Sequence, residues 1–236
     1  MDHGLYGKVN DLYNEKKLLF RIKTLKYLTL PSIQNQINKN FIHRIFYSNF
    51  IPLHIINQLK DLQKTFFFEL IGLERGREAF FNALKNNLNN TINEIICQMN
   101  VDDDDAIAPW LVDYIIKFAP DENCLLTFPL GVLITFENED SEVLETLSKV
   151  SKHNYNCIHL GLTLCSYDGM TTYELSNHTK IKQNFPLLKI IELNFENKFA
   201  WIRSESSTCH HKTYHPKSLH NNEILHNVTL EKIFSI

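Results

Sequence analysis

The sequence predicts an α/β protein built around a mostly parallel, doubly wound sheet. Short apolar segments with strand character alternate with longer helical patterns through the first part of the chain, an order typical of parallel sheets with helices on both faces. The 236 residues are 44% hydrophobic and 22% charged, with only seven Gly and seven Pro. A chain of this length and composition can bury a substantial core in a single domain.

The expected elements follow from apolar spacing and from the positions of proline. Leu18, Ile22 and Leu25 recur at helical spacing, and Pro31 should kink or restart the helix that they mark. Pro52 opens a further helical stretch. The pattern predicts helices over residues 15–36, from 52 onward, over 77–89 and over 109–119, and strands over 4–9, 41–47, 66–73, 94–101 and 124–136.

The chain changes character after about residue 140. Residues 157–164 and 187–203 have strand character without regular helices between them, and the last 30 residues are rich in His, Asn and Ser. We interpret this region as a second, mixed half of the same domain.

Charge and targeting signals narrow the class of protein. The formal net charge of −3 argues against a nucleic-acid binder, because no strongly basic surface is available to neutralise phosphates. The N-terminus MDHGLYGKVN lacks the apolar segment of a signal peptide, and no window approaches the length of apolar chain that spans a membrane. We therefore expect a cytoplasmic protein.

The five cysteines favour reduced thiols over a disulfide framework. They are odd in number and widely spaced, at positions 97, 124, 157, 165 and 209.

Four consecutive aspartates stand at the end of a predicted strand, in the segment NVDDDDAI. Like charges this close repel and raise one another's pKa, so the run is either a solvated acidic loop or a site for a cation. In an extended chain Asp102 and Asp104 point to one side, roughly 7 Å apart, while Asp103 faces away. Oxygen-only ligands suit Mg²⁺ or Mn²⁺, and Asp105 could cap the helix that begins near residue 109.

Other groupings are less specific. A calcium loop of the EF-hand type does not fit, because its fifth position would be Ala106. The cluster CHHKTYH (209–215) suggests zinc but lacks a CxxC partner, and a His-rich loop explains it equally.

Several segments together resemble a known family. The segment FRIKTLKYLTLPSIQNQINKNF (20–41) is similar to the pattern R...F...TLPSI..Q....F, and NVDDDDAI to RLDxDDAI, with Asn100 where an Arg is usual. Looser matches are HLGLTL (159–164), Asn177-His178 and Trp201-Ile202-Arg203. These segments resemble nucleotide-sugar glycosyltransferases of the GT-A fold, and more narrowly the bacterial family labelled putative rhamnosyltransferases. One departure is LYGKVN at the start of the chain, in place of a Thr-Arg-Phe-like opening, which leaves the pocket for the nucleotide base unassigned.

The resemblance implies a GT-A-like single domain over residues 1–236, with a Rossmann-like, mostly parallel sheet. Residues 1–120 would form the nucleotide-sugar-binding half and 121–236 the acceptor side. It also implies transfer of a sugar from a nucleotide-sugar donor to a surface-glycan acceptor, a polysaccharide or lipooligosaccharide, with Mg²⁺ or Mn²⁺. Peripheral association with a membrane and the oligomeric state are left open.

The resemblance also assigns roles to single residues. Asp102 would contact the ribose or the metal, and Asp104 would be the principal metal ligand, with Asp105 nearby. Asp103 would be among the residues that bind the nucleotide sugar. A histidine from the C-terminal half, His178 or His210, could complete the metal site.

Further candidates come from residue chemistry. Arg75 and Arg77 stand near a predicted helix start, where a guanidinium can bind a base or a diphosphate, although a solvated helix start explains them equally. An inverting transferase needs a carboxylate base near the acceptor hydroxyl, and Asp168, Glu174 and Glu205 are candidates.

A retaining mechanism is an open alternative, and so are two rival functions. One is a metal-dependent phosphohydrolase or nucleotidyltransferase that uses the same aspartates. The other is a non-catalytic glycan-binding subunit of the same fold.

Overall fold

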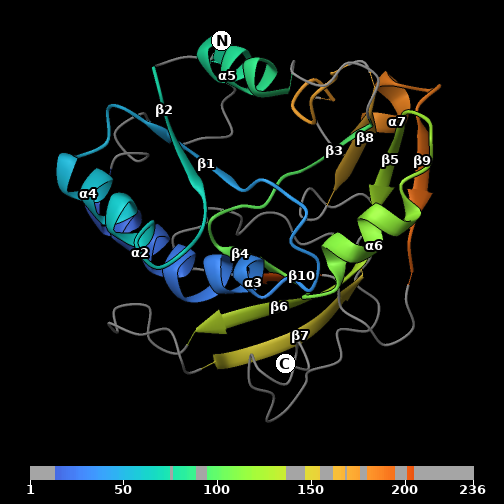
Figure 1. Cartoon of the computed structure of the whole chain (residues 1–236). Coiled ribbons are helices and arrows are strands. Elements are labelled where there is room, and N and C mark those ends of the chain that lie inside the picture. Colours follow the sequence, from blue (N-terminus) through green and yellow to red (C-terminus); the bar gives the residue numbers. More distant parts are fainter. Residues whose placement is uncertain are drawn as a thin grey trace.

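The computed structural model describes residues 14–74, 77–88, 95–136, 147–154, 162–167, 169–175, 180–194 and 201–204. Within these residues the chain forms helices and three β-sheets (Figure 1). The predicted α/β class is therefore confirmed. The predicted strand over residues 4–9 lies outside the described residues.

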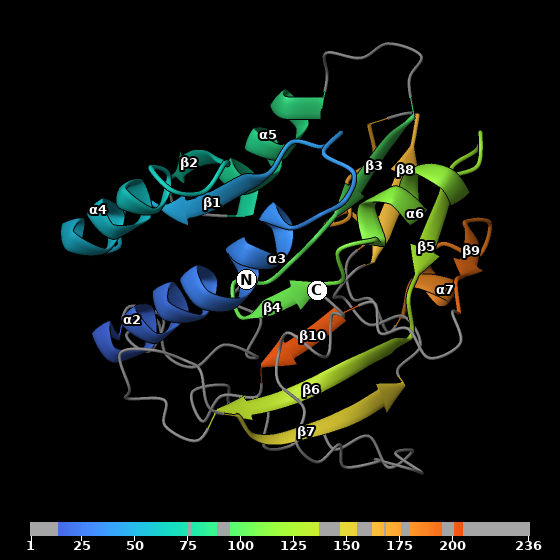
Figure 2. The same cartoon turned by 60° about the horizontal axis from the view of Figure 1, so that its bottom comes forward.

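The strands form one parallel pair and two mixed sheets. The pair is β1 (Arg44–Ser48) with β2 (Glu69–Leu73). One mixed sheet has the order β3 (Ile96–Met99), β8 (Thr163–Ser166), β5 (Cys124–Thr127), β9 (Lys189–Glu192). The other has the order β4 (Asp105–Ile107), β10 (Trp201–Ser204), β6 (Leu130–Phe136), β7 (Leu147–Asn154), whose strands lie side by side in Figure 2.

The expectation of a mostly parallel sheet is wrong for the described strands. Three pairings, β1–β2, β6–β10 and β5–β9, are parallel, and four, β4–β10, β3–β8, β5–β8 and β6–β7, are antiparallel. Strands that follow one another closely in the chain lie in different sheets, as β3 and β4 do, and β5 and β6. Most of their partners come from distant parts of the chain, so the direction of each pairing does not follow from the alternation of strands and helices.

The single strand predicted over residues 124–136 is in fact two strands in different sheets. Phe128 and Pro129 separate β5 from β6. Because proline has no backbone N–H to donate to a strand ladder, it marks the point at which the chain passes from one sheet to the other.

The first predicted helix is present in three consecutive parts, α2 (Glu15–Thr24), a π-helical turn η1 (Leu25–Thr29) and α3 (Leu30–Gln34). Asn14 caps its start, since its side-chain oxygen accepts a hydrogen bond from the Lys17 N–H at 3.3 Å. Pro31 lies in the first turn of α3, where its missing N–H is tolerated, so the predicted restart is confirmed.

The other predicted helices are also present, with shifted ends. They are α4 (Leu53–Leu62), which follows Pro52, α5 (Arg77–Leu88) and α6 (Leu111–Phe118). A short helix α7 (Ile181–Asn184) precedes β9. None of the described helices combines the length and the apolar character needed to cross a membrane.

The hydrophobic core places the segment after the aspartates among several elements. Ile33 of α3, Ile107 of β4, Leu111 of α6 and Leu126 of β5 pack in one buried cluster. A second cluster, which includes Leu25, Leu59 and Phe68, packs α4 and the β1–β2 pair against the first helix. Burial of each such side chain stabilises the fold by about 1.5–3 kcal/mol. These contacts fix β4 and the start of α6 relative to α3.

Candidate functional site

The four aspartates form a tight turn between β3 and β4. The Asp105 N–H donates to the Asp102 carbonyl oxygen at 3.2 Å, so the chain reverses at Asp103 and Asp104. The extended conformation considered for this run is therefore not the one that the chain adopts. Aspartate suits such a turn because its side chain can bond to nearby backbone groups.

The turn brings three of the four carboxylates together. Asp102, Asp104 and Asp105 each offer an oxygen within 4.8 Å of the others, closer than the spacing expected of an extended chain. The three differ in burial, because Asp102 is exposed, Asp104 is intermediate and Asp105 is only 1% exposed. Three anionic oxygens this close repel unless a cation offsets them. Hard oxygen donors in this number fit Mg²⁺ or Mn²⁺.

Asp105 does not cap the following helix, contrary to the sequence prediction. It begins β4, opposite Arg203 in the antiparallel pair with β10. Helix α6 starts only at Leu111, with Trp110 as its N-cap residue and no side-chain cap. The core contacts of β4 therefore carry Asp105 into the turn, where it completes the carboxylate cluster.

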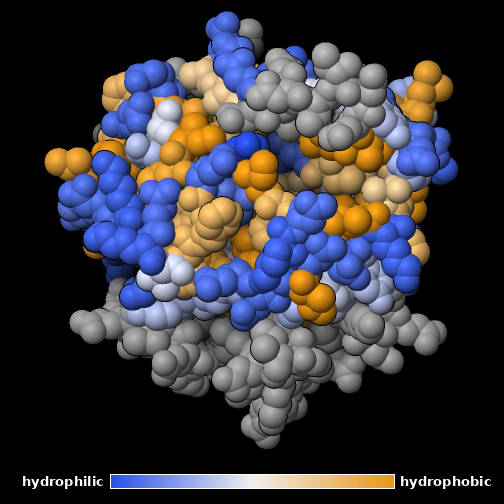
Figure 3. Space-filling view, viewed as in Figure 1, coloured by the Kyte–Doolittle hydropathy of each residue, from blue (hydrophilic) through white to orange (hydrophobic). Residues whose placement is uncertain are grey.

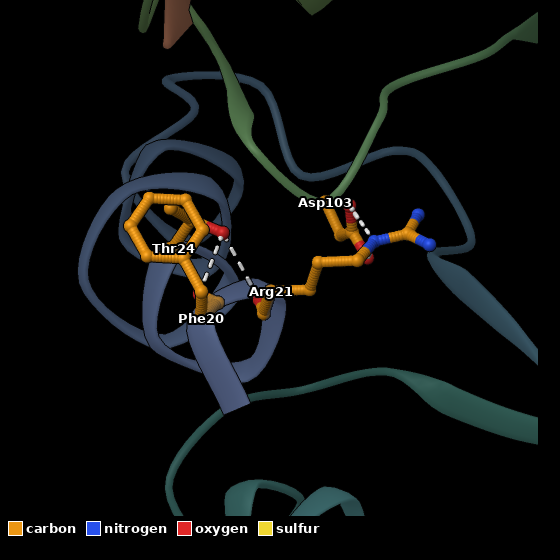
Figure 4. A network of polar contacts seen from close by, with 4 residues as sticks. All are labelled: Phe20, Arg21, Thr24 and Asp103. Atoms are coloured by element: carbon orange, nitrogen blue, oxygen red, sulfur yellow. Dashed lines mark hydrogen bonds and ion pairs between the residues drawn. The ribbon is translucent and has the colours of Figure 1, made fainter. Parts of the chain in front are cut away.

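Asp103 leaves the cluster and pairs with Arg21 of α2. The Arg21 Nε lies 2.7 Å from one carboxylate oxygen of Asp103 and donates to the other at 3.0 Å (Figure 4). Burial, together with the charges of Asp104 and Asp102, raises the pKa of Asp103 to about 6, against the lowering effect of Arg21. The pKa of Arg21 is raised, chiefly by Asp103. The guanidinium of Arg21 thus offsets negative charge on the side of the turn where Asp103 lies.

Arg21 was not among the candidates chosen from the sequence. Its signal was present in the segment 20–41, because the arginine that opens the quoted family pattern falls on Arg21. The Thr24 hydroxyl donates to the carbonyl oxygens of Phe20 and Arg21, at 3.3 and 3.0 Å, just before the π-helical turn (Figure 4). Such back-bonding bends helices.

Two more positions of the same pattern, Ser32 and Gln36, fix the chain that follows the turn. The amide nitrogen of Gln36 donates to the Ala108 carbonyl oxygen at 2.8 Å, and its amide oxygen accepts from the Val112 N–H at 3.1 Å. The Ser32 hydroxyl accepts from the Ile107 N–H at 3.2 Å. Gln36 is 1% exposed and Ser32 is 5% exposed. Buried side chains of α3 and its C-terminal end therefore satisfy backbone groups of residues 107–112.

A cavity of about 950 Å³ opens beside the turn. Its walls come from the first helix, β1 and β3, and include Arg21, Tyr47, Asp102 and Asp103. In the view of Figure 3, hydrophobic residues gather around the middle of the face between these elements. Clefts of this size and mostly apolar lining are typical of small-molecule sites. The charged turn thus lies at the edge of a largely apolar cavity.

Among the candidate bases, Glu174 is the one whose side chain is described. Its carboxylate accepts from the Thr171 N–H at 2.7 Å and lies 2.8 Å from the Lys85 Nζ. Burial raises the pKa of Glu174, but hydrogen bonds from Lys85 and Thr171 outweigh this effect and lower it overall. These contacts tie the turn at residues 171–175 to α5, and the role of Glu174 as a base stays a prediction.

The remaining candidates cannot be placed. Arg77 begins α5, but its side chain lies outside the described residues. Also outside them are Arg75, Asp168, His178, Glu205 and His210.

A comparison with protein families accounts for most of the chain. The family model described as "Putative rhamnosyl transferase" matches residues 2–217. A search of curated proteins finds no match. The match spans the aspartate turn, the helix that carries Arg21 and Ser32, and Gln36 just beyond the end of that helix. The resemblance noted in the sequence is thereby confirmed, and the chain belongs to this family, which makes it a glycosyltransferase.

Proposed function

We propose that this protein transfers a sugar from a nucleotide-sugar donor to a glycan acceptor, with Mg²⁺ or Mn²⁺ held by Asp102, Asp104 and Asp105. One observation carries the proposal. Three carboxylates converge within 4.8 Å of one another at the edge of a cavity of about 950 Å³. A nucleotide-sugar donor needs space for its base and sugar, and a cation beside this space can offset the negative charge of its diphosphate.

The cavity suits the donor better than it suits an extended acceptor. Its apolar walls can hold a base and a sugar ring, Tyr47 contributes a polar group to the cavity wall, and Arg21 contributes another at the turn. Arg21 is half exposed, with 54% of its side chain accessible, so part of its guanidinium is available to phosphate oxygens. In this proposal, Asp103 holds the guanidinium in place.

Departure of the nucleoside diphosphate leaves negative charge on its phosphates. A divalent ion supplies electrostatic stabilisation at that charge. The protein itself holds the three carboxylates in one place. Asp105 is fixed by its position in β4, and the turn positions Asp102 and Asp104 beside it. The candidates for the base that removes the acceptor proton are Asp168, Glu174 and Glu205. His178 is a candidate fourth metal ligand.

The acceptor is proposed to be a growing surface glycan, free or attached to lipid. Family membership supports a sugar acceptor in general, and the finer choice rests on the resemblance. A phosphohydrolase or nucleotidyltransferase would use the same aspartates and would consume the donor without an acceptor sugar.

Thermal unfolding in the presence of ligands tests the proposal. UDP, GDP, dTDP and their sugar derivatives are screened with and without Mn²⁺, because a ligand that binds only the folded state raises its stability, by about 2.7 kcal/mol at 100 times its dissociation constant. At least one nucleotide should raise the melting temperature in a Mn²⁺-dependent way. The shift should vanish in Asp104→Asn and persist in Asp61→Asn, a carboxylate on α4 that pairs with Lys64.

Two outcomes would count against the proposal. If no nucleotide stabilises the protein in the presence of metal, donor binding at this site is contradicted. If the nucleotide is hydrolysed at the same rate whether or not glycan acceptors are present, the phosphohydrolase function is favoured.

A further inference from the structure

Three cysteines lie in one row across the sheet β3–β8–β5. Cys97 of β3 is directly opposite Cys165 of β8, and Cys165 is directly opposite Cys124 of β5. All three are free thiols. The sulfur atoms of Cys97 and Cys165 are only 2.9 Å apart. No sequence pattern predicted this row, because the three residues are far apart along the chain.

The backbone around Cys97 and Cys165 already has a geometry that a disulfide can adopt. Directly opposed residues of antiparallel strands have Cα atoms about 4.5–5.5 Å apart, depending on the type of pair. Disulfides span Cα separations of about 4.4–6.8 Å. A bond between these two sulfurs therefore needs rotation of the side chains and a small approach of the strands, without a change of register.

The two thiols differ in access and in acidity. Cys97 is partly exposed and lines the cavity beside the aspartate turn, whereas Cys165 is fully buried. The hydrogen bond with Cys165 lowers the pKa of the Cys97 thiol, and the same contact, together with burial, raises that of Cys165. Since the thiolate is the reactive form, a soluble oxidant meets Cys97 first.

A metal site explains the row less well. Zinc held by cysteines needs thiolates that converge on one point. Among the residues that the structure describes, the three aspartates are the group in which three such ligand atoms lie within 4.8 Å of one another. The cysteines instead follow a line across three strands, which brings sulfurs together in pairs.

We propose that Cys97 and Cys165 are a modification site, at which hydrogen peroxide converts the two thiols into a reversible cross-strand disulfide. The Cys97 thiolate attacks one peroxide oxygen, the O–O bond breaks, and after protonation one water leaves while Cys97 becomes a sulfenic acid. The Cys165 sulfur then attacks the Cys97 sulfur and displaces the hydroxyl as a second water. In total, two thiols lose two hydrogens, and one peroxide is reduced to two waters.

The bond would alter the wall of the cavity. It would draw the sulfurs from 2.9 Å to a bond of about 2.05 Å, and it would remove the cavity-facing thiol of β3, the strand that leads into the aspartate turn. This inference does not depend on the proposed donor or metal, because it rests on the sheet alone.

Peptide mapping of the full chain tests the proposal. The folded, reduced protein is treated with hydrogen peroxide, its remaining thiols are blocked with N-ethylmaleimide, and it is digested with trypsin without reduction. We expect a linked pair of peptides that has lost two hydrogens, with the bond at Cys97 and Cys165, and dithiothreitol should restore both thiols. Fragment spectra must separate Cys165 from Cys157, since no Lys or Arg lies between them.

Variants separate this pair from its neighbour. Cys124→Ala should keep the linked peptides, whereas Cys165→Ala should lose them and leave the sulfenic acid of Cys97 open to capture by dimedone. The wild-type map decides the matter if a variant fails to fold. A bond between Cys124 and Cys165, a Cys97 that is oxidised without any Cys97–Cys165 link, or a link that forms only in urea would each overturn the proposal.

Discussion

The aspartate turn is supported in two ways that differ in burial. On one side, Ser32 and Gln36 lie in the interior and satisfy backbone groups of residues 107–112. On the other, Arg21 reaches Asp103 from a half-exposed position. An unmade buried hydrogen bond costs the full desolvation of its partner, whereas an exposed ion pair contributes little. We therefore expect the buried side to fix the backbone and the exposed side to set the local charge.

The largest effect is expected from Gln36→Leu. The substitution leaves the Ala108 carbonyl and the Val112 N–H without their partner in the interior, so the free energy of unfolding should fall by about 3 kcal/mol. Urea denaturation measures it. The matched control is Gln34→Leu, at an exposed position at the end of α3, which should change stability by less than about 0.5 kcal/mol. Equal losses of stability in both variants would contradict the role given to the buried hydrogen bonds of Gln36.

The partly buried His43, whose Nδ1 atom is shielded from water, should make stability depend on pH. Burial lowers its pKa from 6.5 to about 4, so between these values the unfolded chain takes up a proton that the folded protein does not. Above pH 6.5, His43 is neutral in both states and does not reduce stability. As the pH falls from 6.5 toward 4, protonation of the unfolded chain lowers the free energy of unfolding. Relative to His43→Phe, the wild type should lose up to about 2 kcal/mol between pH 7.5 and pH 5. Parallel stability curves for the two proteins would show that His43 is not buried in its neutral form.

Ser32→Ala should have a smaller effect than Gln36→Leu. The substitution removes the acceptor of the Ile107 N–H and the donor to the Thr29 carbonyl, which lie at 3.2 and 2.7 Å, and should cost about 1–2 kcal/mol. Ser48→Ala is the comparison, because the Ser48 hydroxyl accepts an exposed hydrogen bond from the Phe50 N–H. Chemical denaturation of both variants should rank Ser32 clearly above Ser48, and the reverse order would refute the role given to the buried side.

The smallest effect on stability is expected at the Arg21–Asp103 pair. A double-mutant cycle with Arg21→Gln and Asp103→Asn should give a coupling energy of about 0.2–1 kcal/mol, as for other exposed ion pairs. The cycle for Lys64 and Asp61, an exposed pair at the C-terminal end of α4, should give a similar value. A coupling of several kcal/mol at Arg21 would mean that this pair, too, holds the backbone.

The sequence predicted the elements of the molecule better than their assembly. Helices that begin after Pro52 or pass through Pro31 follow from local chemistry, and they are present as expected. The prediction of a mostly parallel sheet was wrong because strand pairing depends on partners that are far apart in the sequence. Nothing local to residues 124–136 says that β5 joins β3, β8 and β9, while β6 joins β10 and β7.

The candidate site shows the same limit at a finer scale. The composition of the aspartate run predicted a cation site, and the structure brings Asp102 and Asp104 together as expected. The turn itself was missed, because it depends on anchors at both of its ends, and the helix-capping role considered for Asp105 beside its place near the metal was wrong. Arg21 was missed because it is 82 residues away from Asp103 in sequence.

The central claim is that the carboxylate cluster holds one divalent ion together with a nucleotide. Electron paramagnetic resonance of free Mn²⁺, titrated with protein in the presence of a nucleoside diphosphate that stabilises it, measures this directly. We predict one bound Mn²⁺ per chain in the wild type and in Asp61→Asn, and its loss in folded Asp104→Asn. Undiminished Mn²⁺ binding by Asp104→Asn would contradict the account.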